Sequence, residues 1–190
     1  MKSNLLILQA RLGSTRLPGK VLKEILGIPL IMYQINRIKC SRHLNEIVVA
    51  IPQGLEDDPL HEYLISQNII VYRGSLNNVL SRFKEVISES EAEVIIRSTA
   101  DCPLFMSEIL DRMLVVFDEA NVDYLSNAIT PTFPDGLDIE IFSREAFVHL
   151  TKSELTPRQK EHVTLGFYDG THNFITRNFH NIEDLSSERL

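Results

Sequence analysis

The chain has 190 residues, of which 44% are hydrophobic and 24% are charged, values typical of a single globular domain with a sizeable buried core. A formal net charge of −7 argues against nonspecific binding to nucleic acid, for which a basic surface is expected. The apolar run at residues 5–8 is too short for a signal-peptide core or a membrane span, so we expect a cytoplasmic protein without membrane association.

Short apolar runs, most of them rich in β-branched residues, alternate with segments of helical pattern along the whole chain. Strands are predicted at residues 5–8, 46–51, 69–72 and 94–97, and a later one at Leu137–Phe142. Near-continuous apolar runs suit strands that are covered on both faces, as in a parallel sheet.

Helices are predicted between these strands from apolar spacing and capping residues. The first is expected to run from Pro29 to Cys40, and its inward residues are expected to be Leu30, Tyr33, Ile35 and Ile38. The others are expected near residues 59–67, through Ser88 with Asn77 or Asn78 as the cap, through Glu119 with Ser107 as the cap, and after Thr156, where Thr-Pro-Arg-Gln fits a capping box. The alternation predicts a doubly wound α/β domain with a mainly parallel sheet and helices on both faces.

The most informative segment directly follows the first strand. Residues 9–20 read Gln-Ala-Arg-Leu-Gly-Ser-Thr-Arg-Leu-Pro-Gly-Lys, with glycines, hydroxyls and the cations Arg11, Arg16 and Lys20 close together. Such a loop can turn sharply and direct backbone N–H groups and positive charge at one point, which suits a polyphosphate. It is not the common P-loop, because Val21 stands where that motif needs a hydroxyl.

This segment resembles the signature of the sugar-acid cytidylyltransferases, which include the acylneuraminate and 3-deoxy-manno-octulosonate enzymes. It resembles most the branch named for spore coat polysaccharide biosynthesis protein F. The resemblance implies a nucleotide-diphospho-sugar transferase-like fold in which the loop holds the triphosphate of CTP. It implies that Lys20, Arg11 and Arg16 act in catalysis by offsetting phosphate charge. The nucleotide-binding residues are then expected to be Gln9, Ala10, Arg11, Gly13, Ser14, Arg16, Lys20, Arg73, Ser75 and Thr99.

A lone acid marks the end of the fourth predicted strand. Residues 97–104 read Arg-Ser-Thr-Ala-Asp-Cys-Pro-Leu, which places Asp101 before a proline turn, where it can hold Mg²⁺ against phosphate oxygens. The alternative is that Asp101 caps the next helix. The segment resembles the family's strand-end Asp-x-Pro, which implies that Asp101 is the metal ligand.

Residues 72–82 resemble a family segment, Arg-Gly-Ser followed by Val-Leu-x-Arg, that lies beside the nucleotide. Arg73 and Ser75 are therefore expected to contact ribose, base or phosphate. The alternative is that they form a turn and a helix cap. Asn78 stands where the family often has an acid, so no charged role is expected there.

Asp138 and Glu140 are expected on one face of the later strand, because side chains alternate along a strand. They could bind sugar hydroxyls or a metal, or they could lie on an exposed strand face. The resemblance implies that this strand contributes to the acceptor side of the pocket. The long loop at residues 130–136 divides the chain into a nucleotide-binding half, residues 1–128, and an acceptor and dimerisation half, residues 129–190. The resemblance also implies a homodimer, which the apolar content of Phe142–Leu150 permits.

The resemblance covers the chain from about residue 4 onward, and it also implies a Thr-x-Asp segment after the last strand whose Asp completes the metal site. The sequence stops at Leu190, where that segment would begin. We therefore expect the chain to lack a C-terminal segment, Mg²⁺ to be held mainly by Asp101, triphosphate and water, and turnover to be reduced.

The resemblance implies transfer of CMP from CTP to a sugar or sugar acid, with release of pyrophosphate, for surface polysaccharide biosynthesis. One alternative is a nucleotide-binding homologue with impaired catalysis. Another is a glycosyltransferase that uses a nucleotide sugar. Its usual Asp-x-Asp metal motif is absent at this strand end, because Cys102 and Pro103 follow Asp101.

Overall fold

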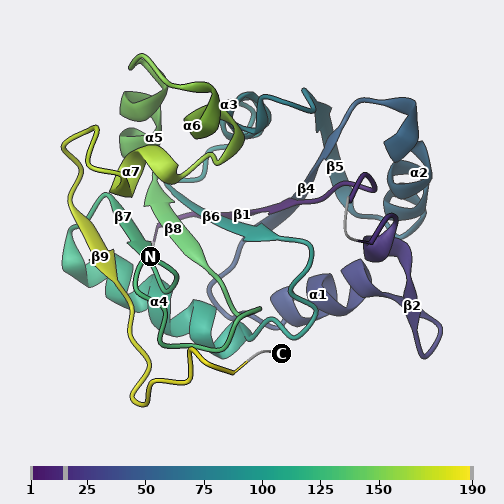
Figure 1. Cartoon of the computed structure of the whole chain (residues 1–190), viewed down its shortest axis with the longest axis horizontal. Helices are drawn as coiled ribbons and strands as arrows, with labels where there is room; N and C mark the ends of the chain where they lie inside the picture. Colours follow the sequence, from purple (N-terminus) through teal and green to yellow (C-terminus); the bar gives the residue numbers. More distant parts are fainter. Residues whose placement is uncertain (1, 15–16, 189–190) are drawn as a thin grey trace.

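The computed structural model describes residues 2–14 and 17–188, and a seven-stranded sheet with the order β5-β4-β1-β6-β8-β7-β9 forms its centre (Figure 1). The strands are β1 (Asn4–Gln9), β4 (Glu46–Pro52), β5 (Ile70–Gly74), β6 (Val94–Thr99), β7 (Tyr124–Ser126), β8 (Glu140–Ser143) and β9 (Thr176–Asn178). All neighbouring pairs are parallel except those of β8, which lies antiparallel between β6 and β7. The predicted mainly parallel α/β fold is confirmed.

Helices cover both faces of the sheet, because its central strands are apolar on both faces. They are α1 (Leu30–Ile38), α2 (Asp58–Ser66), α3 (Val79–Ser88), α4 (Ser107–Ala120), α5 (Arg144–Thr151), α6 (Pro157–Glu161) and α7 (Leu165–Tyr168). In β1, Leu6 and Leu8 face a core shared with α1, α2 and α4. Leu5 and Ile7 face a second core shared with α3, α5 and α7. Figure 1 accordingly shows α1 and α4 on one side of the sheet and α3, α5 and α7 on the other.

The first helix differs from the prediction in its inward face. Pro29 is the N-cap and belongs to the hairpin of β2 (Glu24–Ile25) and β3 (Ile28–Pro29), so the helix begins one residue later than predicted. Its buried residues are Ile31, Met32, Gln34, Ile35 and Ile38. The inward placement of Leu30 and Tyr33 was wrong, since both are half-buried and the Tyr33 hydroxyl donates a hydrogen bond to the Ile25 carbonyl (2.8 Å).

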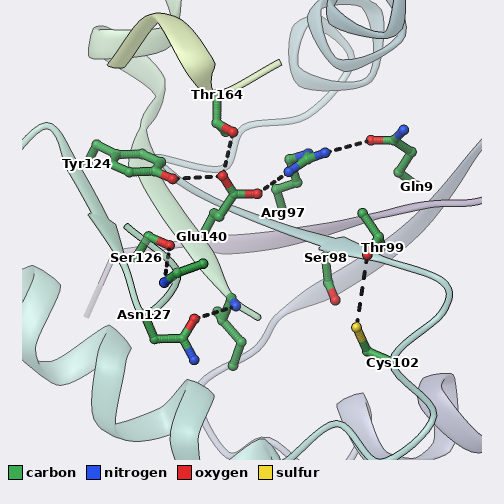
Figure 2. Close-up of polar contacts among 12 residues, drawn as sticks. Gln9, Arg97, Ser98, Thr99, Cys102, Tyr124, Ser126, Asn127, Glu140 and Thr164 are labelled. Atoms are coloured by element: carbon green, nitrogen blue, oxygen red, sulfur yellow. Dashed lines mark hydrogen bonds and ion pairs between the residues drawn. The ribbon is translucent and has the colours of Figure 1, made fainter. Parts of the chain in front are cut away.

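The strand predicted at Leu137–Phe142 begins later, at Glu140. In the preceding loop the Asn127 side chain donates to the Leu137 carbonyl (2.8 Å) and accepts from the Ile139 N–H (2.8 Å), as Figure 2 shows for the second bond. These bonds occupy backbone groups that a longer strand would need for its ladder.

Two predicted helix caps are confirmed and one is wrong. The Asn78 side chain accepts from the Ser81 N–H (3.0 Å), and Thr156 and Gln159 form the capping box of α6. The N-cap of α4 is Met106, so Ser107 is the first residue of that helix and not its cap. Among the described residues, no helix is long and apolar enough to cross a membrane.

Gly74 at the end of β5 provides room for a buried side chain of α3, and we expect Gly74→Ala to destabilise the fold. An added Cβ would lie 2.7 Å from Arg82 Cγ, closer than real Cβ contacts allow, and 3.1 Å from Tyr72 Cε1, which is tighter than most of them. Overpacking of this kind costs about 1–3 kcal/mol, which urea unfolding would measure. Gly54→Ala is the matched control, because a Cβ there meets nothing within 4 Å. Equal losses in the two variants would contradict the packing argument.

Candidate active site

A cleft of about 220 Å³ opens at the carboxyl ends of β1 and β6. It is lined by Gln9, Ala10, Arg11, Ser14, Lys20, Val21, Thr99, Ala100 and Asp101. The chain runs outward from β1 through β4 to β5 and then returns to the other side of β1 as β6, so this is the point where the strand order reverses. Ligands of open α/β sheets bind at such a point.

The loop after β1 folds back on itself above the cleft. Gly19 has the left-handed φ of 68° that favours glycine, and its N–H donates to the Leu12 carbonyl (2.9 Å). The Ser14 N–H donates to the same carbonyl (2.8 Å). The buried carboxylate of Asp57 accepts a hydrogen bond from the Leu12 N–H (2.7 Å). The loop is thus fixed by a residue of the short 3-10 helix η2 (Leu55–Asp57) that the sequence analysis did not single out.

Lys20 and Asp101 meet in the cleft although they lie far apart in the sequence. The Lys20 Nζ is 2.8 Å from Asp101 Oδ2, and the Thr99 hydroxyl donates to Asp101 Oδ1 (2.7 Å). Burial raises the pKa of Asp101, but the hydrogen bonds from Lys20 and Thr99 outweigh it and hold that pKa below its usual value. Asp101 is therefore ionised at neutral pH. The alternative role as helix cap was wrong, since Met106 occupies that position.

The turn that carries Asp101 is held by α1. Gln34 is fully buried, donates to the Thr99 carbonyl (2.8 Å) and accepts from the Cys102 N–H (3.3 Å). These bonds bracket Asp101 from both sides. The sequence analysis missed Gln34, because a glutamine on a helix is usually exposed.

Further positive charge lies beside the cleft. Arg11 lines it and is exposed, whereas Arg82 of α3 is buried and its pKa is lowered to about 10 by burial, with Asp57 opposing and Arg11 adding to the shift. Within the described part of the chain, Arg82 Nε and Nη1 have no hydrogen-bond partner. Arg16, a predicted catalytic residue, lies outside the described residues.

Other predicted nucleotide-binding residues do not line the cleft. Arg73 pairs with Asp58 (2.6 Å) and donates to the Gly54 carbonyl (2.9 Å), which ties the end of β5 to the start of α2. The Ser75 hydroxyl accepts from the Asn78 N–H (3.1 Å) and so forms a turn before α3. Gly13 is exposed on the loop. In this structure Arg73 and Ser75 therefore have the turn and capping contacts of the alternative interpretation.

The alternative that Asp138 and Glu140 lie together on an exposed strand face is wrong, because Asp138 precedes the strand and Glu140 is buried. Glu140 is buried and forms an ion pair with Arg97 of β6, and it accepts hydrogen bonds from the Tyr124 hydroxyl (2.7 Å) and the Thr164 hydroxyl (Figure 2). Both of its carboxylate oxygens are therefore occupied. The reason is that α7 and the residue before it cover this face of the sheet, which alternation along a strand cannot reveal.

Asp138 lies apart from this buried pair, in the loop before β8, where it is exposed. Its pKa is raised by desolvation and then by the neighbouring carboxylates of Asp135, Glu140 and Asp101.

A model of the cytidylyltransferase family matches residues 5–181. The chain belongs to the cytidylyltransferase family. It is therefore a nucleotidyltransferase-like enzyme, and the family resemblance of residues 9–20 is confirmed.

One relative and two solved structures are similar to this cytidylyltransferase. Spore coat polysaccharide biosynthesis protein SpsF of Bacillus subtilis is 36% identical over 172 residues, which cover 87% of this chain and 70% of that protein. A cytidylyltransferase structure from Leptospira borgpetersenii superposes with a TM-score of 0.93 at 31% identity, covering 100% of this chain and 81% of that one. A structure of CMP:2-keto-3-deoxy-manno-octonic acid synthetase complexed with CTP has the same fold, with a TM-score of 0.68 at 17% identity, and covers 94% of this chain and 90% of that one.

The donor set of this cytidylyltransferase fits a loosely held divalent cation. Within residues 2–14 and 17–188, no group of three His, Cys, Asp or Glu side chains could hold a metal by itself. Mg²⁺ is commonly bound by one or two carboxylates together with substrate phosphates and water. Asp101 supplies one such ionised carboxylate at the cleft.

The ionisation of Asp101 should depend on Lys20, and we expect Lys20→Met to raise the pKa of Asp101. The depressed pKa means that the ion pair stabilises the fold fully above the ordinary Asp pKa of about 3.9 and that this contribution is lost as the pH falls through the folded value. Without Lys20 the hydrogen bond from Thr99 and a backbone hydrogen bond would remain to oppose the effect of burial. Carbon-13 NMR titration of the carboxyl groups measures the pH midpoint at which Asp101 ionises. Lys2→Met, which removes the partner of Asp118 at 3.8 Å, should leave the Asp101 midpoint unchanged. An identical Asp101 midpoint in Lys20→Met and wild type would contradict the conclusion that Lys20 lowers the pKa of Asp101.

Proposed function

We propose that the enzyme transfers CMP from CTP to a hydroxyl group of a sugar or sugar acid, for surface polysaccharide biosynthesis. The acceptor oxygen attacks the α-phosphorus in line, the bond from that phosphorus to the bridging oxygen breaks, and pyrophosphate leaves. The hydroxyl proton is released to water. The observation that carries this proposal is the pairing of Lys20 with Asp101 inside the cleft between β1 and β6.

The protein's part in this reaction is positioning and charge neutralisation. Lys20 uses one of its N–H donors on Asp101, which leaves others for a phosphate oxygen. Arg11 adds a guanidinium at the same cleft, and by resemblance Arg16 adds a second. Backbone N–H groups near Gly13 and Ser14 are proposed to bind the phosphates, and Ala10 and Thr99 to complete the wall of the nucleotide site.

Asp101 is proposed to hold Mg²⁺, which when bound would neutralise phosphate charge. The residue's depressed pKa supports this, because a metal ligand must be ionised. Residues 1–128 carry these groups and are proposed as the nucleotide-binding half.

The acceptor is proposed to bind on the side of residues 129–190, near Asp138. That residue is exposed and close enough to Asp101 for the two carboxylates to influence each other. Arg73 and Ser75, whose side chains hold neighbouring turns, are proposed to act on the nucleotide only through those turns. Several relatives are named 3-deoxy-manno-octulosonate cytidylyltransferases, which makes eight-carbon sugar acids the first acceptors to test.

The test begins with a thermal-shift panel of CTP, UTP, ATP and GTP, each with Mg²⁺. The nucleotide that binds raises the melting temperature in proportion to the logarithm of its concentration over its dissociation constant. We expect CTP to give the largest shift. Pyrophosphate release is then measured with CTP and a panel of sugars and sugar acids. A chain that CTP does not stabilise, and that releases no pyrophosphate with any acceptor, would contradict the proposal.

We also propose a cytoplasmic homodimer. Within the segment Phe142–Leu150, whose apolar content was expected to permit a dimer, Phe142, Phe147 and Leu150 are buried in the chain's own core, whereas Val148 is exposed. Val148, together with the exposed apolar side chains of Tyr168 and Ile175 in the later half, supports the proposal. Light scattering coupled to size exclusion would test the oligomeric state.

A further inference from the structure

A row of polar side chains crosses the sheet beside the cleft, on the face that is otherwise apolar. On this face β1 presents Leu5 and Ile7 and then Gln9, and β6 presents Ile95 and then Arg97. Glu140 of β8 lies opposite Arg97 in the register. The face therefore changes from apolar to polar at the edge where the cleft opens.

The polar row forms one continuous set of contacts, drawn in Figure 2. Arg97 donates to Glu140 through Nη1 and to Gln9 Oε1 through Nη2 (3.2 Å). Glu140 is held in turn by the hydroxyls of Tyr124 and Thr164. Arg97 and Glu140 retain only 14% and 12% of their side-chain exposure, so the guanidinium is fixed from the interior of the protein.

This arrangement fixes the orientation of the Gln9 carboxamide. A guanidinium can only donate hydrogen bonds, so the amide must turn its oxygen toward Arg97 and its NH₂ group away from it. Gln9 lines the cleft together with Lys20 and Ser14. Within the described part of the chain, its Nε2 makes no hydrogen bond. The NH₂ group is thus a pair of oriented donors without a protein acceptor at the wall of the cleft.

We infer that Gln9 donates a hydrogen bond to a phosphate oxygen of the bound nucleotide, and that Arg97 and Glu140 are positioning residues that keep its amide donor turned toward the ligand. The inference rests on the proposed function and assigns one contact within it. A neutral amide donor that is held by a buried ion pair can bind an anionic oxygen without any change in its own protonation state. It also complements Lys20, whose charge is shared with Asp101.

The first test is Gln9→Glu, which keeps the shape of the side chain and its acceptor for Arg97 but replaces the donor by a negative oxygen. We expect CTP affinity, measured by calorimetry with Mg²⁺, to fall by about tenfold or more, because bonds to charged groups contribute most. Gln53→Glu is the matched control. It adds the same charge at the carboxyl end of the neighbouring strand β4, at an exposed position that does not line the cleft.

Two smaller ligands, CMP and pyrophosphate, identify which phosphate of the nucleotide Gln9 contacts. If the contact is to the α-phosphate, Gln9→Glu weakens CMP binding and leaves pyrophosphate binding unchanged, and if it is to the outer phosphates the reverse holds. Either result supports the inference. If the wild-type chain binds CTP and Gln9→Glu binds it equally tightly, the inference is overturned and the proposed function remains intact. Failure of the wild-type chain to bind CTP would overturn both.

The second test separates positioning from a structural role. The double variant Arg97→Met/Glu140→Met removes the ion pair without leaving a buried charge alone. We expect it to weaken CTP binding when Gln9 is present and to have no further effect in a Gln9→Ala background, because the pair acts on the bound nucleotide only through that amide. Equal weakening in both backgrounds would overturn the positioning role. If the double variant fails to fold, Gln9→Ala and Gln9→Glu alone still decide whether the contact exists.

Discussion

Asp101→Asn is expected to lower turnover about a hundredfold, which corresponds to about 2.7 kcal/mol of barrier. Asn keeps the size of the side chain but removes the charge that pairs with Lys20 at 2.8 Å and that would hold the metal. The residue is well placed for so large an effect, because Gln34 fixes the turn on both sides of it. Pyrophosphate release with CTP and an acceptor measures the loss, and CTP affinity with Mg²⁺ gives a second readout that does not depend on the acceptor.

Asp118→Asn is the control for this substitution. Asp118 also pairs with a lysine, Lys2, at 3.8 Å, but it lies on α4 and does not line the cleft. We expect this variant to keep wild-type turnover. If Asp101→Asn retained more than about a third of wild-type turnover, a loss of less than about 0.7 kcal/mol in the barrier, the placement of Asp101 at the reacting phosphates would be wrong.

Glu140→Ala is expected to reduce the free energy of unfolding by about 3–5 kcal/mol, the usual cost of leaving one member of a buried ion pair alone. Arg97 would lose the carboxylate that, against the effect of burial, raises its pKa. The hydroxyls of Tyr124 and Thr164 would lose their acceptor as well. Urea unfolding monitored by circular dichroism measures the change.

Glu145→Ala is the matched control, because Glu145 is exposed in the first turn of α5, a short distance along the same chain segment. Its loss should stay within about 0.5 kcal/mol. A Glu140→Ala variant as stable as Glu145→Ala would show that the buried ion pair is not a structural element. The acceptor-binding role predicted for Glu140 would then need to be considered again.

Local signals in the sequence were sufficient for much of the fold. The run at residues 5–8 became the buried centre of β1, and the caps at Asn78 and Thr156 appeared as predicted, since each depends on contacts within three residues. The loop from Gln9 to Lys20 could also be identified, because its glycines and cations are close together in the sequence.

The contacts that complete the site could not be predicted in this way, because they join distant segments. Asp57 meets the Leu12 N–H across 45 positions of the chain, and Arg97 meets Gln9 across 88. Strand alternation correctly places Glu140 on a polar face at the cleft edge, but it cannot show that another element covers that face. An acidic residue in a strand signals either a ligand site or a buried pair, and only the tertiary structure distinguishes the two.

Lys20 is the central residue of the proposed triphosphate site, and calorimetric titration of CTP with Mg²⁺ into Lys20→Ala tests that site most directly. We expect the dissociation constant to rise at least tenfold, about 1.4 kcal/mol, relative to wild type. Lys23→Ala, at an exposed lysine just beyond the 3-10 helix η1 (Lys20–Leu22), should bind CTP as wild type does. A Lys20→Ala variant that binds CTP as tightly as wild type would contradict the assignment of this cleft to the triphosphate.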